Sequence, residues 1–233
     1  MTLVLFDIDG TLIHSGRAGL RGMTRAFAGL YGHAQALDDV PFAGRTDRWI
    51  VREAFGRHHI AESEEEYDRF RTTYFEYLRA ELPRVPAGEW AGVFPGVEAT
   101  LEALSRTARV AVGLLTGNFE GGAAIKLSHF GLWQQFTFGA FGDRHVDRRD
   151  LVPVALAQAA ARGVGSTRVV VVGDTPLDVE CAHAHGATAI AVATGPYDAG
   201  QLAGTGAEVV VRSLADVDWP MICSPGRMRA KGR

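Results

Sequence analysis

The sequence is poor in cysteine, and it contains no long apolar run. Cys181 and Cys223 are the only cysteines in 233 residues, too few for a disulfide framework or a thiolate-rich metal site. The longest apolar runs, such as Val169–Val172, are far shorter than the ~20 residues that span a membrane. The start of the chain has neither a basic flank nor a small-residue cleavage site, so no signal peptide is predicted. These absences favour a cytoplasmic protein with no membrane partner.

Neither sign of charge dominates the chain. Lys and Arg number 24 against 27 Asp and Glu, which gives a formal net charge of −3. This balance provides no general attraction to nucleic acid, so we expect no nucleic-acid partner. Lysine is nearly absent, because every basic residue except Lys126 and Lys231 is an arginine. A mechanism that needs a lysine in a folded site therefore has almost no choice of residue.

Apolar runs of strand length alternate with segments of helix length. The continuous apolar run Leu3–Phe6 indicates a strand covered on both faces, as in a parallel sheet. Further runs of this kind lie at 110–115, 136–138, 169–172, 188–192 and 209–211. Between several of them, apolar residues recur at spacings of three and four, as in an amphipathic helix. This order predicts an α/β fold, a doubly wound, Rossmann-like parallel sheet with right-handed crossovers.

Residues 14–92 interrupt this alternation and are predicted to form an inserted cap. They contain three helical stretches, at about 16–31, 45–58 and 62–82. A segment rich in proline and glycine follows them and would act as a hinge back to the core. The core is predicted to consist of residues 1–13 and 93–215. Residues 216–233 are predicted to be a C-terminal tail that is basic and frayed toward its end.

Acidic residues follow two of the predicted strands. Asp7 and Asp9 come directly after the first strand, and Asp174 follows 169–172, with Asp178 one turn into the next helix. In open α/β sheets the functional groups gather beyond the carboxyl ends of the strands, so these carboxylates are expected to converge. Crowded carboxylates repel one another unless a cation neutralises them. Because the available ligands are oxygen atoms, the expected ion is Mg²⁺.

The segment Thr116-Gly117-Asn118 follows the predicted strand at 110–115. Thr116 offers a hydroxyl group, and the backbone amides after it open a helix, which suits phosphate oxygens. Lys126 or a nearby arginine would supply the positive charge that a phosphate needs. Together with the acidic residues, this arrangement indicates phosphoryl transfer from a phosphorylated substrate.

Three ordered motifs resemble those of the haloacid dehalogenase superfamily, which consists mostly of Mg²⁺-dependent phosphatases. Asp7-Ile8-Asp9-Gly10-Thr11-Leu12 resembles its first motif, Thr116 its second, and Gly173-Asp174-Thr175-Pro176-Leu177-Asp178 its fourth. The helical insert between the first two motifs is similar to the C1 cap of the phosphoglycolate-phosphatase-like branch. The resemblance covers residues 3 to 215. It implies that the substrate is a small phosphomonoester, such as phosphoglycolate or a sugar phosphate.

The resemblance also implies a role for each matched acidic residue. Asp7 would be the nucleophile that forms an aspartyl-phosphate, and Asp9 would be the general acid and base. The Asp7 side chain, the Asp9 backbone carbonyl and Asp174 would hold the Mg²⁺. Asp178 would lie behind them as an outer-sphere ligand.

Other residues are expected to contact the substrate. By the same resemblance, Thr116 would hydrogen-bond the transferring phosphoryl group. Three neighbours are predicted to line the phosphate site with it: Gly10, Gly117 and Asn118. In the cap, Arg45 is a candidate for contact with the non-reacting end of the substrate. Asp47, at the start of a predicted helix, is more typical of a residue that compensates the helix dipole.

The third motif departs from the pattern of the superfamily. The superfamily usually places a lysine here, often followed by proline, but this chain reads Asp147-Arg148-Arg149-Asp150-Leu151. Either Arg148 takes the role, or Lys126 reaches in from the helix after the second motif. We favour Lys126, because it is the only lysine inside the predicted folded region. It would screen the acidic residues from one another and bind a phosphate oxygen.

The pattern also bears on other activities and on other classes of protein. Phosphonoacetaldehyde hydrolase-like chemistry needs a cap lysine, and residues 14–92 contain none. A true haloacid dehalogenase has no need of Asp9. A receiver-type signalling domain has its acidic pair adjacent in sequence and lacks an inserted cap. A phosphoglucomutase-like phosphoryl transferase stays open, as does a binding module impaired at the third motif, and no oligomeric state is predicted.

Overall fold

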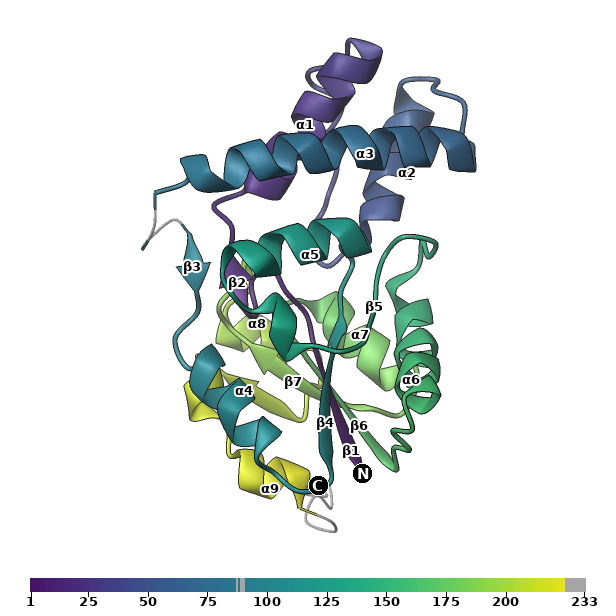
Figure 1. Cartoon of the computed structure of the whole chain (residues 1–233). Coiled ribbons are helices and arrows are strands. Elements are labelled where there is room, and N and C mark those ends of the chain that lie inside the picture. The colour runs from purple at the N-terminus through teal and green to yellow at the C-terminus, as the bar shows by residue number, and fades with distance from the viewer. Residues whose placement is uncertain (87, 89–90, 225–233) are drawn as a thin grey trace.

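The computed structural model describes residues 1–86, 88 and 91–224 and has two parts, a sheet-containing core and a helical cap (Figure 1). The core is a parallel sheet of six strands in the order β5-β4-β1-β6-β7-β8. The strands are β1 (Thr2–Phe6), β4 (Val110–Leu115), β5 (Gly139–Ala140), β6 (Arg168–Gly173), β7 (Thr188–Val192) and β8 (Val209–Val211). The predicted doubly wound α/β core is confirmed.

The central position of β1 explains its continuous apolar sequence. Leu3 is paired with Ala111 of β4 on one side and with Val169 of β6 on the other. Val4 and Phe6 pack in one apolar cluster, whereas Leu3 and Leu5 pack in the other. Successive side chains of a strand point to opposite faces, so a strand covered on both sides must be apolar throughout.

Helices cover both faces of the sheet. They are α4 (Val97–Ser105), α5 (Glu120–His129) and α9 (Trp219–Cys223) on one face, and α6 (Leu151–Ala161), α7 (Pro176–His183) and α8 (Ala199–Ala203) on the other. Short 3₁₀ helices are η1 (Leu82–Arg84), η2 (Trp133–Gln135), η3 (Arg148–Asp150) and η4 (Leu214–Asp216). Within the described part of the chain, no helix combines the length and the apolar character needed to cross a membrane.

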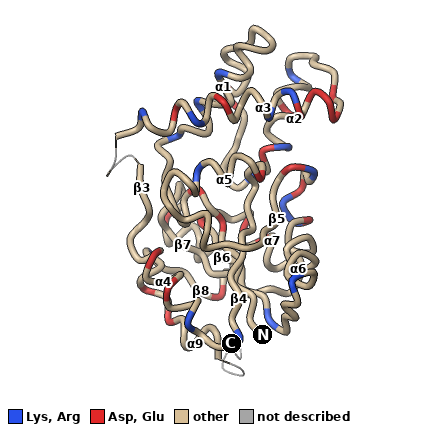
Figure 2. The backbone as a smooth tube through the Cα atoms, viewed as in Figure 1, with Lys and Arg blue, Asp and Glu red and all other residues tan. Residues whose placement is uncertain are grey.

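The cap consists of α1 (Ala18–Tyr31), α2 (Asp47–Arg57) and α3 (Glu64–Glu81), close to the three predicted helices. Aromatic residues form its centre, where the rings of Phe27 and Phe70 lie 4.7 Å apart and those of Phe27 and Phe55 lie 5.9 Å apart. The outer surface is charged, and acidic residues gather at the start of α3 (Figure 2). The cap therefore has an apolar core of its own above the carboxyl edge of the sheet.

Two segments of the core differ from the sequence prediction. The run 136–138 is not a strand, because β5 begins at Gly139 and pairs only with the end of β4. Phe136 and Phe138 are buried there as packing residues, which explains their apolar character. The crossings between core and cap form a two-stranded antiparallel ribbon, β2 (Ile13–His14) with β3 (Gly92–Val93), which the sequence did not reveal. Strands of two residues are too short to show periodicity.

The core also extends beyond residue 215, where a tail was predicted to begin. In α9, the Trp219 ring lies 6.0 Å from that of Phe6, and its Nε1 donates to Thr100 Oγ1 at 3.2 Å. Ile222 of the same helix is fully buried. Residues 216–223 therefore complete the core. The expected fraying concerns mainly residues 225–233, including Lys231, which lie outside the described residues.

Replacing Trp219 should test this assignment. Trp219→Ala removes a buried aromatic ring and the hydrogen bond to Thr100, so we expect it to lower the free energy of unfolding by about 3–5 kcal/mol. Met221→Ala, at an exposed position of the same helix, should change it by less than about 0.5 kcal/mol. Denaturant unfolding measures both. If Trp219→Ala changed the free energy of unfolding as little as Met221→Ala, α9 would not contribute to the core.

Candidate active site

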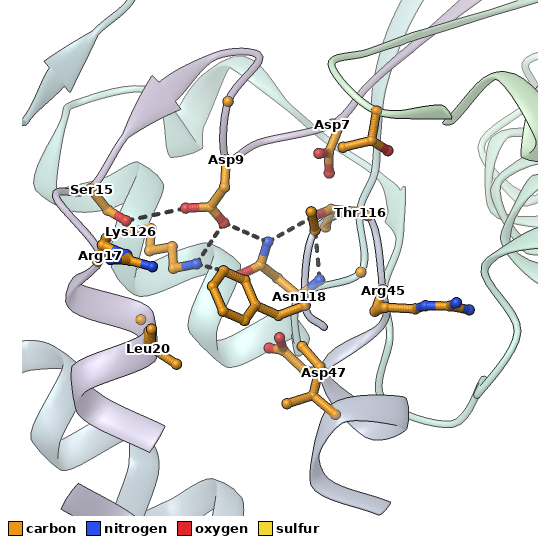
Figure 3. A pocket seen from close by; sticks show the side chains of 18 of the residues that line it. Asp7, Asp9, Ser15, Arg17, Leu20, Arg45, Asp47, Thr116, Asn118 and Lys126 are labelled. Atoms are coloured by element: carbon orange, nitrogen blue, oxygen red, sulfur yellow. Dashed lines mark hydrogen bonds and ion pairs between the residues drawn. The ribbon is translucent and has the colours of Figure 1, made fainter. Parts of the chain in front are cut away.

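A pocket of about 450 Å³ lies between the carboxyl edge of the sheet and the cap (Figure 3). Core residues form one side, and residues of α1, α2 and α3 form the other. The polar residues that line it include Asp7, Asp9, Ser15, Asp47, Tyr74, Thr116, Asn118, Lys126, Arg148 and Asp174. Most of the predicted site residues are therefore brought together, although they come from widely separated parts of the chain.

Three buried carboxylates meet at one end of this pocket. Asp7, Asp174 and Asp178 each offer an oxygen atom, and these atoms lie within 4.8 Å of one another. Asp7 follows β1 and Asp174 follows β6, so the parallel pairing of the two strands brings them together. Gly10 turns the chain here with φ of 83°, and a Cβ atom at this residue would overlap the Asp174 carboxylate. Gly10, which is predicted to line the phosphate site, thus lies in the pocket beside the acidic cluster.

Arg148 is the cation that contacts this cluster. Its Nη2 lies 3.0 Å from Asp7 Oδ1 and 2.5 Å from Asp178 Oδ1, and its guanidinium is buried. Burial raises the pKa of Asp7 to about 6, although the Arg148 charge opposes this shift. Burial and the charge of Asp178 raise the pKa of Asp174 well above its usual value. One guanidinium is thus insufficient for three buried carboxylates, and the cluster is suited to a further cation.

The donor set fits Mg²⁺, because it consists of oxygen atoms in a buried corner. Asp178 accepts from Arg148 through Oδ1 and from the backbone and hydroxyl of Thr175 through Oδ2, at 3.0 and 2.7 Å. Asp7 and Asp174 are therefore the carboxylates best placed to face an ion. Asp178 positions Arg148 and the start of α7 behind them. The Asp9 carbonyl as a ligand stays a prediction.

Asp9 lies at the centre of a second polar network (Figure 3). Its Oδ2 accepts from Lys126 Nζ at 2.6 Å and from Asn118 Nδ2 at 2.9 Å. Its Oδ1 accepts from Ser15 Oγ at 3.2 Å. Burial favours a higher pKa, but the Lys126 charge and these hydrogen bonds outweigh burial and lower the pKa of Asp9. Without substrate, Asp9 therefore favours its ionised carboxylate form.

The two candidate cations occupy different places, which corrects the preference for Lys126 at the third motif. Lys126 contacts Asp9 and Asn118, whereas Arg148 has the place beside Asp7 that the superfamily gives to a lysine. The two side chains contact different carboxylates because they enter the pocket from different elements. The ammonium of Lys126, on α5, approaches from the cap side of the pocket. Arg148 comes from η3 and contacts two carboxylates with one planar group.

Thr116, at the end of β4, is fully buried at the pocket. Its Oγ1 accepts from the Asn118 amide groups at 3.3 Å (backbone) and 2.8 Å (side chain), so its own proton can be donated to a phosphate oxygen. Asn118 in turn joins Thr116 to Asp9. Gly117 lies against the cap, and its carbonyl oxygen accepts from the backbone of Asp47 at 2.7 Å.

The cap is attached to the core through the start of α2. Thr46 Oγ1 donates to the Val146 carbonyl at 3.0 Å, and Asp47 Oδ2 accepts from the Phe119 amide at 2.8 Å. Asp47 therefore does more than compensate a helix dipole, because it connects cap to core and lines the pocket. The exposed Arg45 lies over the Trp49 ring at 4.6 Å and points away from Asp9 (Figure 3).

Sequence reasoning did not identify Tyr74 as a pocket residue. It lies in α3, its side chain is fully buried, and its hydroxyl has no hydrogen-bond partner within the described residues. Tyr74 follows the spacing of the other apolar residues of α3, which pack in the cap core. Only the pocket geometry therefore distinguishes it from a packing residue.

A family model for haloacid dehalogenase-like hydrolases matches residues 4–192. The chain belongs to this family. A phosphoglycolate phosphatase of Rhodospirillum rubrum is 29% identical over 234 residues, which cover 96% of this chain and 92% of that protein. The tyrosine-protein kinase PtkA of Mycobacterium tuberculosis is 30% identical over 222 residues, 93% of this chain and 70% of that protein.

A crystal structure of a hydrolase from Pseudomonas syringae has the same fold. Its TM-score to this chain is 0.66 at 21% sequence identity, and the match covers 93% of this chain and 95% of that one. The two chains therefore share their fold over nearly their whole length.

The burial of Asp47 should be visible in the pH dependence of stability. Burial raises the pKa of Asp47 to about 7, against the opposing charge of Lys126. Between its unfolded pKa of about 4 and this value, the folded state holds a proton that the unfolded state has released, so stability falls as pH rises. Asp47→Asn should therefore reduce this loss of unfolding free energy by more than about 1 kcal/mol.

The measurement is denaturant unfolding at several pH values from 4 to 8. Asp38→Asn, at an exposed position of the cap, is the control and should leave the slope unchanged because that side chain stays in water. The same slope for wild type and Asp47→Asn would contradict the effect of burial at this carboxyl group.

Proposed function

We propose that this protein is a Mg²⁺-dependent phosphatase that hydrolyses a small phosphomonoester through an aspartyl-phosphate on Asp7. The observation that supports it best is the position of Asp7. Its carboxylate opens into the pocket between Arg148 and Asp174, with the Thr116 hydroxyl lining the same pocket. A nucleophile, a cation and a hydroxyl that can donate a hydrogen bond to phosphate thus lie together in one pocket.

In the first step, an Asp7 oxygen attacks phosphorus and the bond from phosphorus to the ester oxygen breaks. The departing alcohol takes a proton from Asp9. In the second step, Asp9 takes a proton from water, the water oxygen attacks phosphorus, and the bond to Asp7 breaks to release phosphate. The pair with Lys126 lowers the pKa of Asp9 and favours the carboxylate form that Asp9 has between the two steps. The proton that Asp9 donates in the first step requires that its pKa rise when the negatively charged substrate binds beside it.

Asp7 and Asp174 would hold the Mg²⁺, with the Asp9 carbonyl as a further ligand. The ion would neutralise charge on the phosphate and on the buried carboxylates. Arg148 would bind a phosphate oxygen while it stays paired with Asp7 and Asp178, and its Nε has no other partner within the described structure. Thr116 would donate its hydroxyl proton to another phosphate oxygen.

The pocket favours a small metabolite as substrate. Its volume of about 450 Å³ is bounded by the cap, which is hydrogen-bonded to the core through Thr46 and Asp47. A pocket of this size beneath the cap restricts the size of the ester. The phosphoglycolate phosphatase of Rhodospirillum rubrum supports the same substrate range by its similarity along the chain.

The central test is a Mg²⁺-dependent assay of phosphate release from p-nitrophenyl phosphate and a panel of small phosphomonoesters. We expect turnover that EDTA abolishes and Mg²⁺ restores. Asp7→Asn keeps the size of the side chain but removes the nucleophile, so kcat should fall by at least about 10³-fold. Normal turnover in Asp7→Asn would exclude the aspartyl-phosphate. Transfer to another substrate molecule without phosphate release would favour a mutase.

A second test addresses the cation beside the nucleophile. Arg148→Met removes the charge that stabilises phosphate and should lower kcat/KM for every phosphomonoester by about 10²–10³-fold. Arg148→Lys should restore part of the activity because it keeps a positive charge. Arg149→Met is the matched control, since Arg149 is exposed and paired with Asp147. Similar kinetics for Arg148→Met and Arg149→Met would remove Arg148 from the site.

A further inference from the structure

The pocket has an apolar wall on its cap side, and the hydrolysis steps do not use it. Four residues form this wall: Leu20 and Met23 of α1, Ile50 of α2, and Phe42 in the segment between the two helices. Leu20 lies across the polar network from Asp7 (Figure 3). The apolar wall therefore borders the space into which the organic group of a bound phosphate ester would extend.

The helical period brings these side chains to one surface. Leu20 and Met23 are three residues apart in α1, and Ile50 follows Asp47 by three residues in α2, so each pair shares a helix face. Met23 and Ile50 also belong to the apolar core of the cap, and Leu20 packs against it. Phe42, which is 41% exposed, ends the wall at the opening of the pocket. The pocket thus reaches from the acidic cluster to the apolar core of the cap.

Few polar groups on this side of the pocket are free to bind a ligand. Ser15 Oγ donates to Asp9, and Asp47 Oδ2 accepts from the Phe119 amide. The Tyr74 hydroxyl has no partner within the described residues, but it is fully buried, so a ligand in the open part of the pocket does not reach it. Hydroxyl or carboxylate groups of a substrate would therefore find few partners here.

The basic side chains that line the pocket outside the phosphate site lie against aromatic rings: Arg17 over Phe42, Arg45 over Trp49, and His14 against Phe94. Arg17 and Arg45 are exposed. Charges in water attract a doubly negative phosphate toward the pocket, but they are screened and add little to the binding of an inner group. The apolar wall remains as the surface that contacts the organic group.

The energies of transfer from water favour a hydrocarbon at this wall. A polar group loses its hydrogen bonds to water there without gaining others. Each methylene that is buried raises affinity by about 3-fold to 4-fold. The flexible side chain of Met23 can adapt to groups of different shape. The pocket volume of about 450 Å³ lies in the range of about 300–1,000 Å³ that holds drug-sized molecules, so such a group fits beside the phosphate.

We propose that Leu20, Met23, Phe42 and Ile50 bind the organic group of the substrate and that this group is a hydrocarbon chain or ring. The protein then prefers phosphate esters of apolar alcohols over sugar phosphates and over phosphate esters of hydroxy acids such as 2-phosphoglycolate. This inference rests on the proposed phosphatase activity and names the class of ester on which it acts.

Alkyl phosphates of different length test the proposal. Ethyl and hexyl phosphate release primary alcohols of almost equal acidity, so for the enzyme they differ in the methylenes that the wall would bury. We expect kcat/KM of wild type to be at least about 30-fold higher for hexyl phosphate. Hexyl phosphate should also be hydrolysed with a higher kcat/KM than 2-phosphoglycolate.

A second pair of esters compares two rings of the same size. Cyclohexylmethyl phosphate and glucose 6-phosphate both have a six-membered ring one carbon from the ester oxygen, but only the sugar ring has hydroxyl groups. We expect wild type to favour the hydrocarbon ring by at least about 10-fold in kcat/KM, because the sugar hydroxyls would lose their hydrogen bonds to water.

Variants of the wall should change the ratio of kcat/KM for hexyl and ethyl phosphate. Leu20→Asn places an amide of nearly the same size in the wall and should lower the ratio about 10-fold. Met23→Gln should lower it as well. Leu30→Asn is the matched control, because Leu30 is a half-buried leucine of the same helix that packs against the cap core but lies outside the pocket lining. Its ratio should equal that of wild type, and a general loss of activity leaves a ratio unchanged.

Binding gives a second readout that does not depend on turnover. With Mg²⁺ present, calorimetry should show that wild type binds hexylphosphonate, which is not hydrolysed, at least about 10-fold more tightly than ethylphosphonate. The heat capacity change on binding should be more negative for hexylphosphonate, because burial of apolar surface has this effect. Leu20→Asn should reduce both differences, and Leu30→Asn should not.

The apolar wall and the phosphatase activity fail separately. Hydrolysis of ethyl and hexyl phosphate with similar kcat/KM, or a preference for glucose 6-phosphate or 2-phosphoglycolate, would overturn the apolar site and leave the phosphatase intact. A preference for hexyl phosphate that neither Leu20→Asn nor Met23→Gln alters would also overturn it. Absence of phosphate release from every ester would contradict the proposed function, and the phosphonate titration then tests the wall by itself.

Discussion

The structure depends on the cost of burying several carboxylates at one edge of a parallel sheet. Asp7 and Asp174 are brought together because β1 and β6 are neighbours, and Asp178 joins them from the first turn of α7. Negative charges in a buried corner are tolerated only when cations and N–H donors face them. Arg148 and the backbone of Thr175 supply part of this compensation. The remaining charge makes the corner suitable for a divalent ion and a phosphate.

The chain meets the need for positive charge with two different cations in two different places. Arg148 contacts Asp7 and Asp178 together, which its planar group with several donors allows. Lys126 provides a compact charge at Asp9, and the amide of Asn118 keeps it there. Asp7, the proposed nucleophile, and Asp9, the proposed acid and base, thus have separate electrostatic environments. This separation suits the two roles proposed for them, one acting on phosphorus and the other transferring protons.

The cap contributes to the site as well as covering it. The Asp47 carboxylate accepts a hydrogen bond from the Phe119 amide, so the start of α2 is fixed to the segment that follows Thr116. Gly19 of α1 and Tyr74 of α3 lie close to Lys126, because a Cβ atom at Gly19 would be 3.1 Å from Lys126 Nζ and 3.5 Å from Tyr74 Oη. The wall of the pocket is therefore built jointly by cap and core.

Local sequence patterns were enough to predict the sheet, the inserted cap and the acidic end of the site. These follow from local patterns, namely apolar runs, helical spacing and motifs whose residues come directly after strands. The prediction misplaced one edge strand at 136–138 and missed the ribbon of β2 and β3, because such short segments carry no period. Residues 216–223 showed no clear pattern, although Trp219 packs in the core.

Which cation contacts which carboxylate follows only from the packing of the elements in space. Lys126 and Arg148 were both candidates for the third motif, and only the directions from which α5 and η3 approach the pocket separate them. The same holds for Tyr74, whose spacing in α3 is that of a packing residue. Side-chain reach depends on distances between elements far apart in sequence. A local pattern can specify an element and its exposed face, but not the partner that another element brings to it.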